Sequence, residues 1–520
     1  MTALLPGKAT FAPGEEVTVE VRGASESVTL TRLGDVLAEA PVVDGWARFG
    51  PLEPGGYGIE AAGAHSALDV LEDPLSRPRY GFVSHYETGR DATGVVENAR
   101  RLHLNAVQFY DWMYRHADLI PPADAFRDAL GQELSLDSVR RLADSLAAAG
   151  SLPFGYAAVY AAGADEWASW KDEGLFHDDG EPWMLADFLW IVDPSSERWM
   201  DYFASELSRA AEVGFAGFHL DQYGAPKLAV RRDGRRIDLA EAFPALLRRV
   251  HELLPEARLI FNNVNDFPTW ATAPTPVAAV YIEVWSPHER LGDLGALIAR
   301  ARAFGQGKPV ILATYLEPYR DDDTGGRAAE QLMLATVFSH GATALVHGEE
   351  QAVLVDPYYV RHAVQSAESL ESTRRLYDFA VRHGDLIFDP RAVDVTGSFA
   401  GGINQEIVVE APVPVSVECA PGSLWVRVVC VSDGLLVHLI DLSSQSDDRW
   451  NAPKGPGRLL EGVRLRIERA GGTPKLRVAD PFRSPTLRPL DLVVEARHVV
   501  AEVPPFETWA LIWCQTPFGV

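Results

Sequence analysis

Two acidic residues end apolar stretches that have the character of buried strands. Asp221 ends GFAGFHLD, and Glu283 ends AAVYIE. If both strands run into one opening, the two carboxyl groups can face the same bond. Cleavage of a glycosidic bond needs such a pair, about 5–5.5 Å apart for retention of configuration and about 6.5–9.5 Å apart for inversion.

The surroundings of the two acids suggest different roles. A general acid must stay protonated, and an apolar shell raises its pKa. Glu283 stands beside Tyr281, Val284 and Trp285, and its longer side chain can reach a leaving-group oxygen. We therefore predict Asp221 as nucleophile and Glu283 as general acid/base. The structural alternatives are a helix cap or ion pair for Asp221 and a hydrogen bond in the barrel mouth for Glu283.

Further polar and aromatic residues lie at the ends of the predicted strands or just beyond them, and together they suit a sugar. Apolar faces of sugar rings pack on aromatic rings, and hydroxyl groups bond to amides, imidazoles and carboxylates. The aromatic candidates can instead be packing residues, and the histidines can be buried structural groups. The predicted substrate-binding residues are Tyr110, Asp111, Trp112, His116, Asn263, Trp285, His347 and Glu349.

Between residues 76 and 389, short apolar runs alternate with amphipathic stretches. This pattern predicts an α/β fold, a central (β/α)8 TIM barrel with its chemistry at the carboxyl ends of the strands. Helices are expected at 93–103, 135–150, 196–214, 239–254 and 327–341, three of them ending at Gly150, Gly214 and Gly341. The predicted strands cover residues 79–85, 105–111, 152–160, 215–221, 258–264, 279–285, 309–315 and 343–349.

The two flanks of this region alternate apolar and polar residues without helical patterns. Residues 1–75 predict an N-terminal Ig-like β-sandwich, with strands such as 18–23, 27–34 and 57–63. Residues 390–520 predict a C-terminal antiparallel β-sandwich. Its expected strands cover 406–411, 415–420, 424–432, 435–442, 462–471 and 507–514.

Charge and composition narrow the classes of partner. The formal net charge of −26 repels phosphate backbones and anionic membranes, so nucleic acid is not expected as a partner. Three cysteines, and the absence of HxH or HExxH spacing, predict neither a metal site nor a cofactor. No apolar run approaches a membrane span, and no secretory signal is visible, so a cytoplasmic protein is expected unless a leader was removed. The sequence does not determine the oligomeric state.

Several motifs, taken in order, resemble glycoside hydrolase family 66, the family of dextranases and cycloisomaltooligosaccharide glucanotransferases. They are FYDWMYRH, FHLDQYG, YIEVW, HGE and PYYV, and they span roughly residues 80–389. The resemblance implies cleavage of α-1,6-glucans such as dextran or isomaltooligosaccharides with retention. It places the nucleophile at Asp221 and the acid/base at Glu283. The segment 315–330 after the seventh strand is too short for the large insertion that the glucanotransferases carry.

Rival functions remain open at this stage. A phosphosugar enzyme would hold an anion after strand eight, where this chain has two carboxylates, Glu349 and Glu350. A transglycosylase of the same family would use the same two acids. A catalytically silent carbohydrate-binding barrel would not need to keep both.

Overall fold

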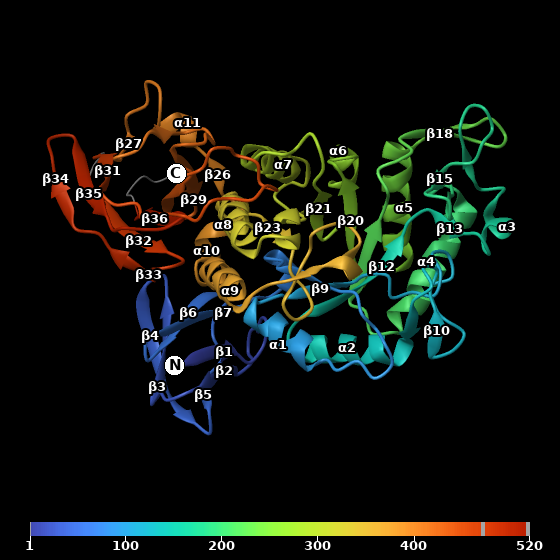
Figure 1. Cartoon of the computed structure of the whole chain (residues 1–520), viewed down its shortest axis with the longest axis horizontal. Helices are drawn as coiled ribbons and strands as arrows, with labels where there is room; N and C mark the ends of the chain where they lie inside the picture. Colours follow the sequence, from blue (N-terminus) through green and yellow to red (C-terminus); the bar gives the residue numbers. More distant parts are fainter. Residues whose placement is uncertain (1, 470–473, 516–520) are drawn as a thin grey trace.

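The computed structural model describes residues 2–469 and 474–515. Its centre is a sheet of eight parallel strands, arranged in the order in which they occur in the chain (Figure 1). All eight predicted strands are present. They are β8 (Tyr80–Val83), β9 (Ala106–Phe109), β12 (Leu152–Ala158), β17 (Gly217–Asp221), β20 (Arg258–Val264), β21 (Ala279–Glu283), β22 (Val310–Ala313) and β23 (Thr343–Leu345).

Helices connect these strands, and all five expected helices form. Gly150, Gly214 and Gly341, which follow three of them, have φ values of +77°, +115° and +72°, a region that glycine adopts without strain. Only the single-turn α6 (Thr269–Thr272) separates β20 from β21. The other main helices are α1 (Thr93–Arg101), α2 (Leu136–Ala148), α4 (Glu197–Ala211), α5 (Leu239–Leu253), α7 (Leu291–Phe304), α8 (Asp323–Ser339) and α9 (Ala367–Arg382).

The first and last strands of the sheet approach each other. The side-chain amide of Asn98, on α1, donates to the carbonyl of Gly348, just beyond β23 (2.6 Å). The backbone N–H of Ser84, just beyond β8, donates to Glu349 (3.2 Å). The parallel sheet is therefore a nearly closed barrel. We call the place where β8 and the chain after β23 meet the seam.

Side chains alternate between the barrel interior and the helix layer, as strand geometry requires. On β20, Ile260 belongs to the apolar cluster inside the barrel, whereas its neighbour Phe261 belongs to the cluster between sheet and helices. On β21, Tyr281 and Ile282 divide in the same way. This alternation fixes which residues at the strand ends face the opening.

The chain before the barrel forms one seven-stranded antiparallel sheet around its own apolar cluster. Where a two-sheet Ig-like sandwich is expected, β4 pairs with β3 along one part and with β5 along another, so the two halves share a strand. The strands are β1 (Ala3–Pro6), β2 (Val17–Arg22), β3 (Ser27–Arg32), β4 (Asp35–Val43), β5 (Trp46–Phe49), β6 (Gly55–Ala61) and β7 (Ala64–Val70).

The chain after the barrel forms two sheets that share one apolar cluster. The expected strand 462–471 is found at Val463–Glu468, and residues 470 and 471 lie outside the described residues. The first sheet contains β26 (Val393–Asp394), β28 (Val415–Ser416), β29 (Leu424–Val431), β30 (Gly434–Asp441), β36 (Trp509–Gln515), β32 (Lys475–Asp480) and β33 (Ser484–Pro489). The second contains β27 (Ile407–Glu410), β31 (Val463–Glu468), β35 (His498–Val503) and β34 (Leu492–Val494).

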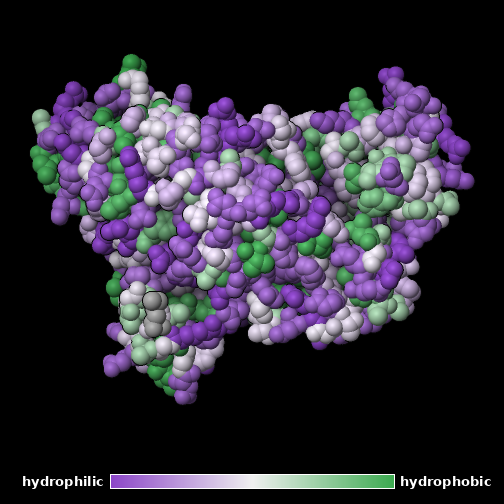
Figure 2. All heavy atoms as spheres, in the orientation of Figure 1, coloured by the Kyte–Doolittle hydropathy of each residue, from purple (hydrophilic) through white to green (hydrophobic). Residues whose placement is uncertain are grey.

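The two flanking regions lie at the same end of the molecule, with β33 beside the N-terminal sheet (Figure 1). Arg477 of β32 donates to Asp35 at the start of β4 (2.8 Å), which joins them directly. On the face shown in Figure 2, hydrophobic side chains are scattered among hydrophilic ones. Within the described residues, none of the helices combines the length and apolar character needed to cross a membrane.

Candidate active site

Asp221 is the last residue of β17, and its side chain points into the barrel mouth. Asp221 is two residues from His219, so the two side chains point to the same face of the strand. The ring of His219 lies inside the barrel against Tyr281. The hydroxyl of Tyr156, on the adjacent strand β12, donates to Asp221 Oδ2 (2.7 Å). The amide of Asn262, on β20, donates to Asp221 Oδ1 (2.7 Å). Two neighbouring strands thus fix the orientation of this carboxylate.

Glu283 occupies the matching position at the end of β21. Its side chain is 9% exposed. The hydroxyl of Tyr315, two residues beyond β22, donates to Glu283 Oε1 (2.7 Å). The Asn262 amide nitrogen donates to Glu283 Oε2 (2.9 Å). This acid is therefore also held from both sides.

Asn262 connects the two acids through a single nitrogen atom. Because Nδ2 lies 2.7 Å from Asp221 Oδ1 and 2.9 Å from Glu283 Oε2, those oxygens are no farther apart than the sum of the two distances. This upper limit is smaller than the separation of the two carboxyl groups in inverting glycosidases, roughly 6.5–9.5 Å. It is compatible with the separation in retaining ones, roughly 5–5.5 Å. The limit applies to this one pair of oxygen atoms, and it brings the two carboxyl groups close enough to act on the same bond.

Burial and proximity change the proton affinity of both acids. Burial is the main cause that raises the pKa of Asp221, and the charge of Glu283 raises it further. Burial also raises the pKa of Glu283, against the opposing effect of its hydrogen bonds with Asn262 and Tyr315. Two such groups hold one proton between them over a wide pH range. The pair can therefore supply one acid and one carboxylate at the same time.

The floor below the pair is uncharged. Burial lowers the pKa of His219 to about 3, so its ring stays neutral. Its Nδ1 lies 3.2 Å from the hydroxyl of Tyr80. Tyr80 and His219 therefore bring no positive charge to the floor below the carboxylates.

Aromatic rings form the wall around the acids, and two predicted residues belong to it. Tyr110 stacks on Tyr359 with 4.3 Å between ring centroids, and it lies 5.4 Å from the ring of Tyr156. Trp285 is 39% exposed, and its ring lies 5.6 Å from that of Tyr315. The structure therefore brings Tyr110 and Trp285 together with the acid pair.

Trp112 and His347 lie elsewhere, inside the protein. Trp112 has no exposed surface, donates its indole N–H to the carbonyl of Tyr156 (3.0 Å) and packs on Phe215. His347 is buried and bonds through Nε2 to Glu330 on α8 (2.6 Å). Both side chains are thus buried and bonded to the protein, although Nδ1 of His347 has no hydrogen-bond partner among the described residues. The predicted sugar contacts of Trp112 and His347 stay a prediction.

Asn263 also points away from the acids. Its amide donates to the carbonyl of Tyr281 (2.9 Å), and its oxygen accepts from Thr272 on α6 (2.5 Å). The predicted role of Asn263 as a sugar contact is therefore corrected. The asparagine that faces the opening is Asn262, because it is two residues from Ile260 and so points to the same, inner face of the strand.

Asp111 and His116 line a separate small pocket, together with Asp128. Burial, and then the charges of Asp128 and Asp221, raise the pKa of Asp111 to about 8. Burial, with Arg115 as a smaller cause, lowers the pKa of His116 to about 4. Asp111 is thus near enough to feel the charge of Asp221, and His116 is a neutral ring beside it.

Glu349 is 3% exposed and lies at the seam, away from the acid pair. It contacts His85 Nδ1 through Oε1 and accepts the Ser84 backbone N–H at Oε2. His362 joins the same group. These bonds are all made to the protein itself, and the predicted sugar contact of Glu349 stays a prediction.

Four functional side chains are absent from the predicted set: Tyr156, Asn262, Tyr315 and Tyr359. Tyr156 and Asn262 lie on inward positions of β12 and β20, and Tyr315 lies two residues beyond β22 and continues the inward series of Ile311 and Ala313. The signal that identifies them is the period of two along a strand, counted from an interior residue such as Ile260.

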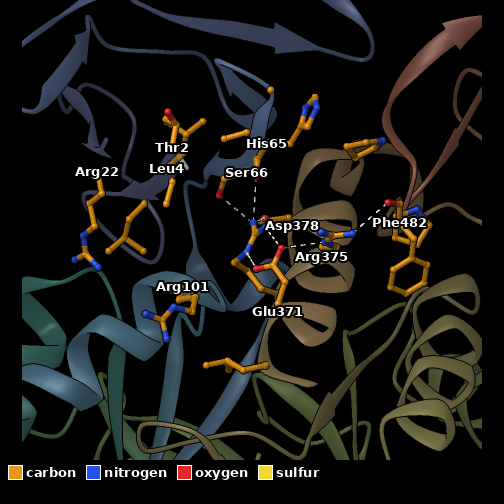
Figure 3. Close-up of a pocket in the computed structure, with 18 of the residues that line it drawn as sticks. Thr2, Leu4, Arg22, His65, Ser66, Arg101, Glu371, Arg375, Asp378 and Phe482 are labelled. Carbon is orange, nitrogen blue, oxygen red and sulfur yellow. Dashed lines mark hydrogen bonds and ion pairs between the residues drawn. The ribbon is translucent and has the colours of Figure 1, made fainter. Parts of the chain in front are cut away.

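A cavity of about 870 Å³ lies away from the acids, where β7, α9 and the loop before β33 meet (Figure 3). Its cations are already paired: Arg22 with Glu97 (2.9 Å), and Arg374 and Arg375 with Glu371 (2.7 and 2.9 Å). Three further arginines of the lining, Arg101, Arg382 and Arg483, pair with Glu97, Glu60 and Glu507 (2.6, 2.7 and 3.8 Å). The two carboxylates that line the cavity, Glu371 and Asp378, both pair with Arg374 and so differ from the acid pair in the barrel mouth.

Comparison with known proteins places the chain in a family. The model of glycosyl hydrolase family 66 matches residues 57–513. Two cycloisomaltooligosaccharide glucanotransferases of Niallia circulans are 27% identical over 330 residues and 26% identical over 288 residues, or 57% and 48% of this chain. The matches span only 33% and 29% of the length of those relatives.

Solved structures agree on the fold. A Paenibacillus cycloisomaltooligosaccharide glucanotransferase, solved with cycloisomaltoheptaose, superposes with a TM-score of 0.88 at 18% identity, covering 98% of this chain and 100% of that one. A maltogenic α-amylase from Thermotoga neapolitana gives a TM-score of 0.53 at 11% identity, covering 85% and 100%. With the family match over most of its length, the chain belongs to glycosyl hydrolase family 66, a family of glycosidase-class enzymes.

Proposed function

We propose that this protein cleaves α-1,6-glucosidic bonds of dextran or isomaltooligosaccharides with retention of configuration. The observation that carries the proposal is the Asn262 nitrogen, bonded to Asp221 and Glu283 at once. We take the nearly closed sheet as a (β/α)8 barrel, in which catalytic groups lie at the carboxyl ends of strands.

The proposed reaction has two displacements. Asp221 attacks the anomeric carbon while Glu283 gives its proton to the departing glycosidic oxygen, so one C–O bond forms and one breaks. Glu283, now a carboxylate, then takes a proton from water as the water oxygen attacks the same carbon and releases Asp221. Tyr156 keeps Asp221 aligned, and Tyr315 does the same for Glu283. Because both acids accept two hydrogen bonds, their roles follow from reach: the shorter side chain attacks carbon and the longer one reaches oxygen.

The substrate class is supported by chemistry and by the relatives. The wall of Tyr110, Tyr359 and Trp285 offers flat apolar faces for pyranose rings. A neutral glucan is not repelled by the net charge of −26. The similar proteins are named for cycloisomaltooligosaccharides, which fits α-1,6-linked glucose as the substrate here.

Transfer to a sugar acceptor is the second candidate activity. In a retaining mechanism the acceptor enters beside the acid/base, where the leaving group has been. Trp285, which is 39% exposed and stands two residues from Glu283, offers an acceptor ring a surface on which to stack. The names of the relatives point in the same direction.

The test uses Asp221→Ala and Glu283→Ala with an activated α-glucoside and added azide. Azide fits the space left by Asp221 and attacks from that face, so Asp221→Ala should yield a β-glucosyl azide. Glu283→Ala should still form the covalent intermediate, which azide then intercepts to give an α-glucosyl azide. Without azide, each variant should lose at least about 10³-fold in turnover.

Wild-type enzyme with azide is the control and should form glucose or transfer products instead. The same azide anomer from both variants, or near-full activity of either one, would contradict the assignment. Product analysis on dextran and on short isomaltooligosaccharides separates linear products of hydrolysis from larger or cyclic products of transfer.

A further inference from the structure

Three side chains of the kinds that bind transition metals meet at the seam. They are His85, which follows β8, Glu349, which follows β23, and His362, which follows the single-turn η3 (Tyr359–Arg361). One ligand atom of each lies within 4.8 Å of the others. We propose that these three residues bind one zinc-class divalent ion, which links the two ends of the barrel sheet.

Hydrogen bonds to the backbone orient two of the ligands. Nδ1 of His362 lies 2.9 Å from the carbonyl of Tyr359, so this nitrogen carries the proton and Nε2 keeps its lone pair. Glu349 Oε2 accepts the N–H of Ser84, which leaves Oε1 on the side of His85. Metal-binding histidines and carboxylates are commonly held by such outer bonds, which fix tautomer and direction. The ion would take the place of the proton between His85 and Glu349.

The charge around the group favours a dication. Arg90 lies beside the group, 3.9 Å from Glu349 Oε2. It also pairs with Glu350 (3.2 Å) and Glu87 (3.6 Å). Three carboxylates face one guanidinium, so the local charge is −2 when the histidines are neutral. An ion of charge +2 balances this charge.

The ligand types determine which metal fits. Two imidazoles and one carboxylate are a frequent set for Zn²⁺ and similar late transition metals, whereas Ca²⁺ and Mg²⁺ prefer oxygen atoms alone. The His85 side chain is 40% exposed, so a water molecule can complete the coordination from the open side. The site is therefore of the three-ligand, open type.

The position gives the ion a structural role. The ligands come from the chain after β8, the chain after β23 and the chain after η3, and the ring of His362 packs 5.8 Å from Phe82 on β8. Phe82 in turn lies 5.2 Å from Tyr359, part of the wall around the acids. An ion here would hold the seam without contacting Asp221 or Glu283, so the inference does not depend on the proposed reaction.

The experiment titrates the full chain, after dialysis against a chelator, with ZnCl₂ at pH 7.5 by calorimetry and by thermal unfolding. We expect one ion per chain and a rise in Tm of about 2 °C near hundredfold saturation. His362→Ala and Glu349→Gln should each weaken binding at least tenfold. The control, His251→Ala, removes a histidine from α5 outside the group and should bind as wild type does.

Three outcomes would overturn the proposal. They are the absence of stoichiometric binding, equal binding by wild type and both ligand variants, and tighter binding of Ca²⁺ or Mg²⁺ than of Zn²⁺. Glu349→Gln keeps the shape of the side chain and its acceptor for Ser84, so its comparison with wild type remains valid if His362→Ala folds poorly. Visible absorption of the Co²⁺ complex provides a second readout, since its intensity reports the coordination number and geometry of the bound ion.

Discussion

Polar side chains behave differently in two parts of the barrel opening. One part is the mouth, formed by β17, β20 and β21, and the other is the rim, formed by the segments that follow β9 and β23. At the mouth, Asp221, Asn262 and Glu283 bond to one another across the opening. At the rim, Trp112 and His347 turn into the helix layer and bond to a backbone carbonyl and to Glu330. Both groups of residues follow apolar stretches of similar appearance.

The difference comes from where the strand ends. Asp221 and Glu283 are the last residues of their strands, so the inward–outward alternation still governs their direction. Trp112 and His347 come after Phe109 and Leu345, the ends of β9 and β23, where the turn and not the pleat decides the direction. A polar residue within a strand can therefore be assigned to a face more securely than one just beyond it.

The sharpest test of the alternation compares two neighbouring asparagines. Asn262→Ala should lower kcat by about 10²-fold, since it removes an oriented donor shared by both acids. Asn263→Ala should keep kcat within a few-fold but lower the free energy of unfolding by about 1–3 kcal/mol, because Thr272 and a buried carbonyl lose their partner. Kinetics and denaturant unfolding of both variants measure the contrast, and equal kinetic defects would contradict it.

The pH profile of kcat/KM tests the proton affinities of the two acids at the mouth, and the expected effect is of intermediate size. Activity needs Asp221 ionised and Glu283 protonated, so it should fall on both sides of an optimum that burial moves above the usual carboxyl range. The Tyr315 hydrogen bond favours the charged form of Glu283 and lowers its pKa. Tyr315→Phe should therefore raise that pKa and move the alkaline limb to higher pH. Movement to lower pH would refute this role of Tyr315.

Substitution of two tryptophans compares a residue at the opening with a residue in the interior. Trp285→Ala should raise KM for longer oligosaccharides by a few-fold with a smaller change in stability than at a fully buried site, because 39% of Trp285 is exposed at the opening. Trp112→Ala should lower stability by about 3–5 kcal/mol, as expected for loss of a fully buried large ring. Steady-state kinetics and unfolding of both proteins provide the check, and a stable Trp112→Ala with raised KM would reverse the interpretation.

The smallest expected effect is that of a chelator on turnover. The proposed reaction uses only carboxyl groups, and the seam residues His85, Glu349 and His362 lie outside it. Initial rates at 25 °C should be the same with and without EDTA. Loss of activity that a divalent ion restores would show that a metal takes part in the chemistry.

The sequence was sufficient for the barrel strands and for five of the helices, but α7 and α9 were not among the expected helices, and the bonds between elements were not predicted. The eight strands, five helices and the glycines at 150, 214 and 341 are local patterns, and all are found. The bond from Asn262 to two acids joins residues 41 and 21 positions away, and the group at the seam joins His85 to Glu349. No local pattern carries such pairings, because the closing of the sheet creates them.

Trapping of the covalent intermediate tests the central claim most directly. A slow fluorinated α-glucosyl fluoride should label the enzyme once, and mass spectrometry of a tryptic digest should place the label in the peptide of residues 210–227, on Asp221. Glu283→Ala should increase the labelled fraction, because hydrolysis of the intermediate is then slow. A label on Glu283 or Asp111, or its absence under turnover, would contradict the account.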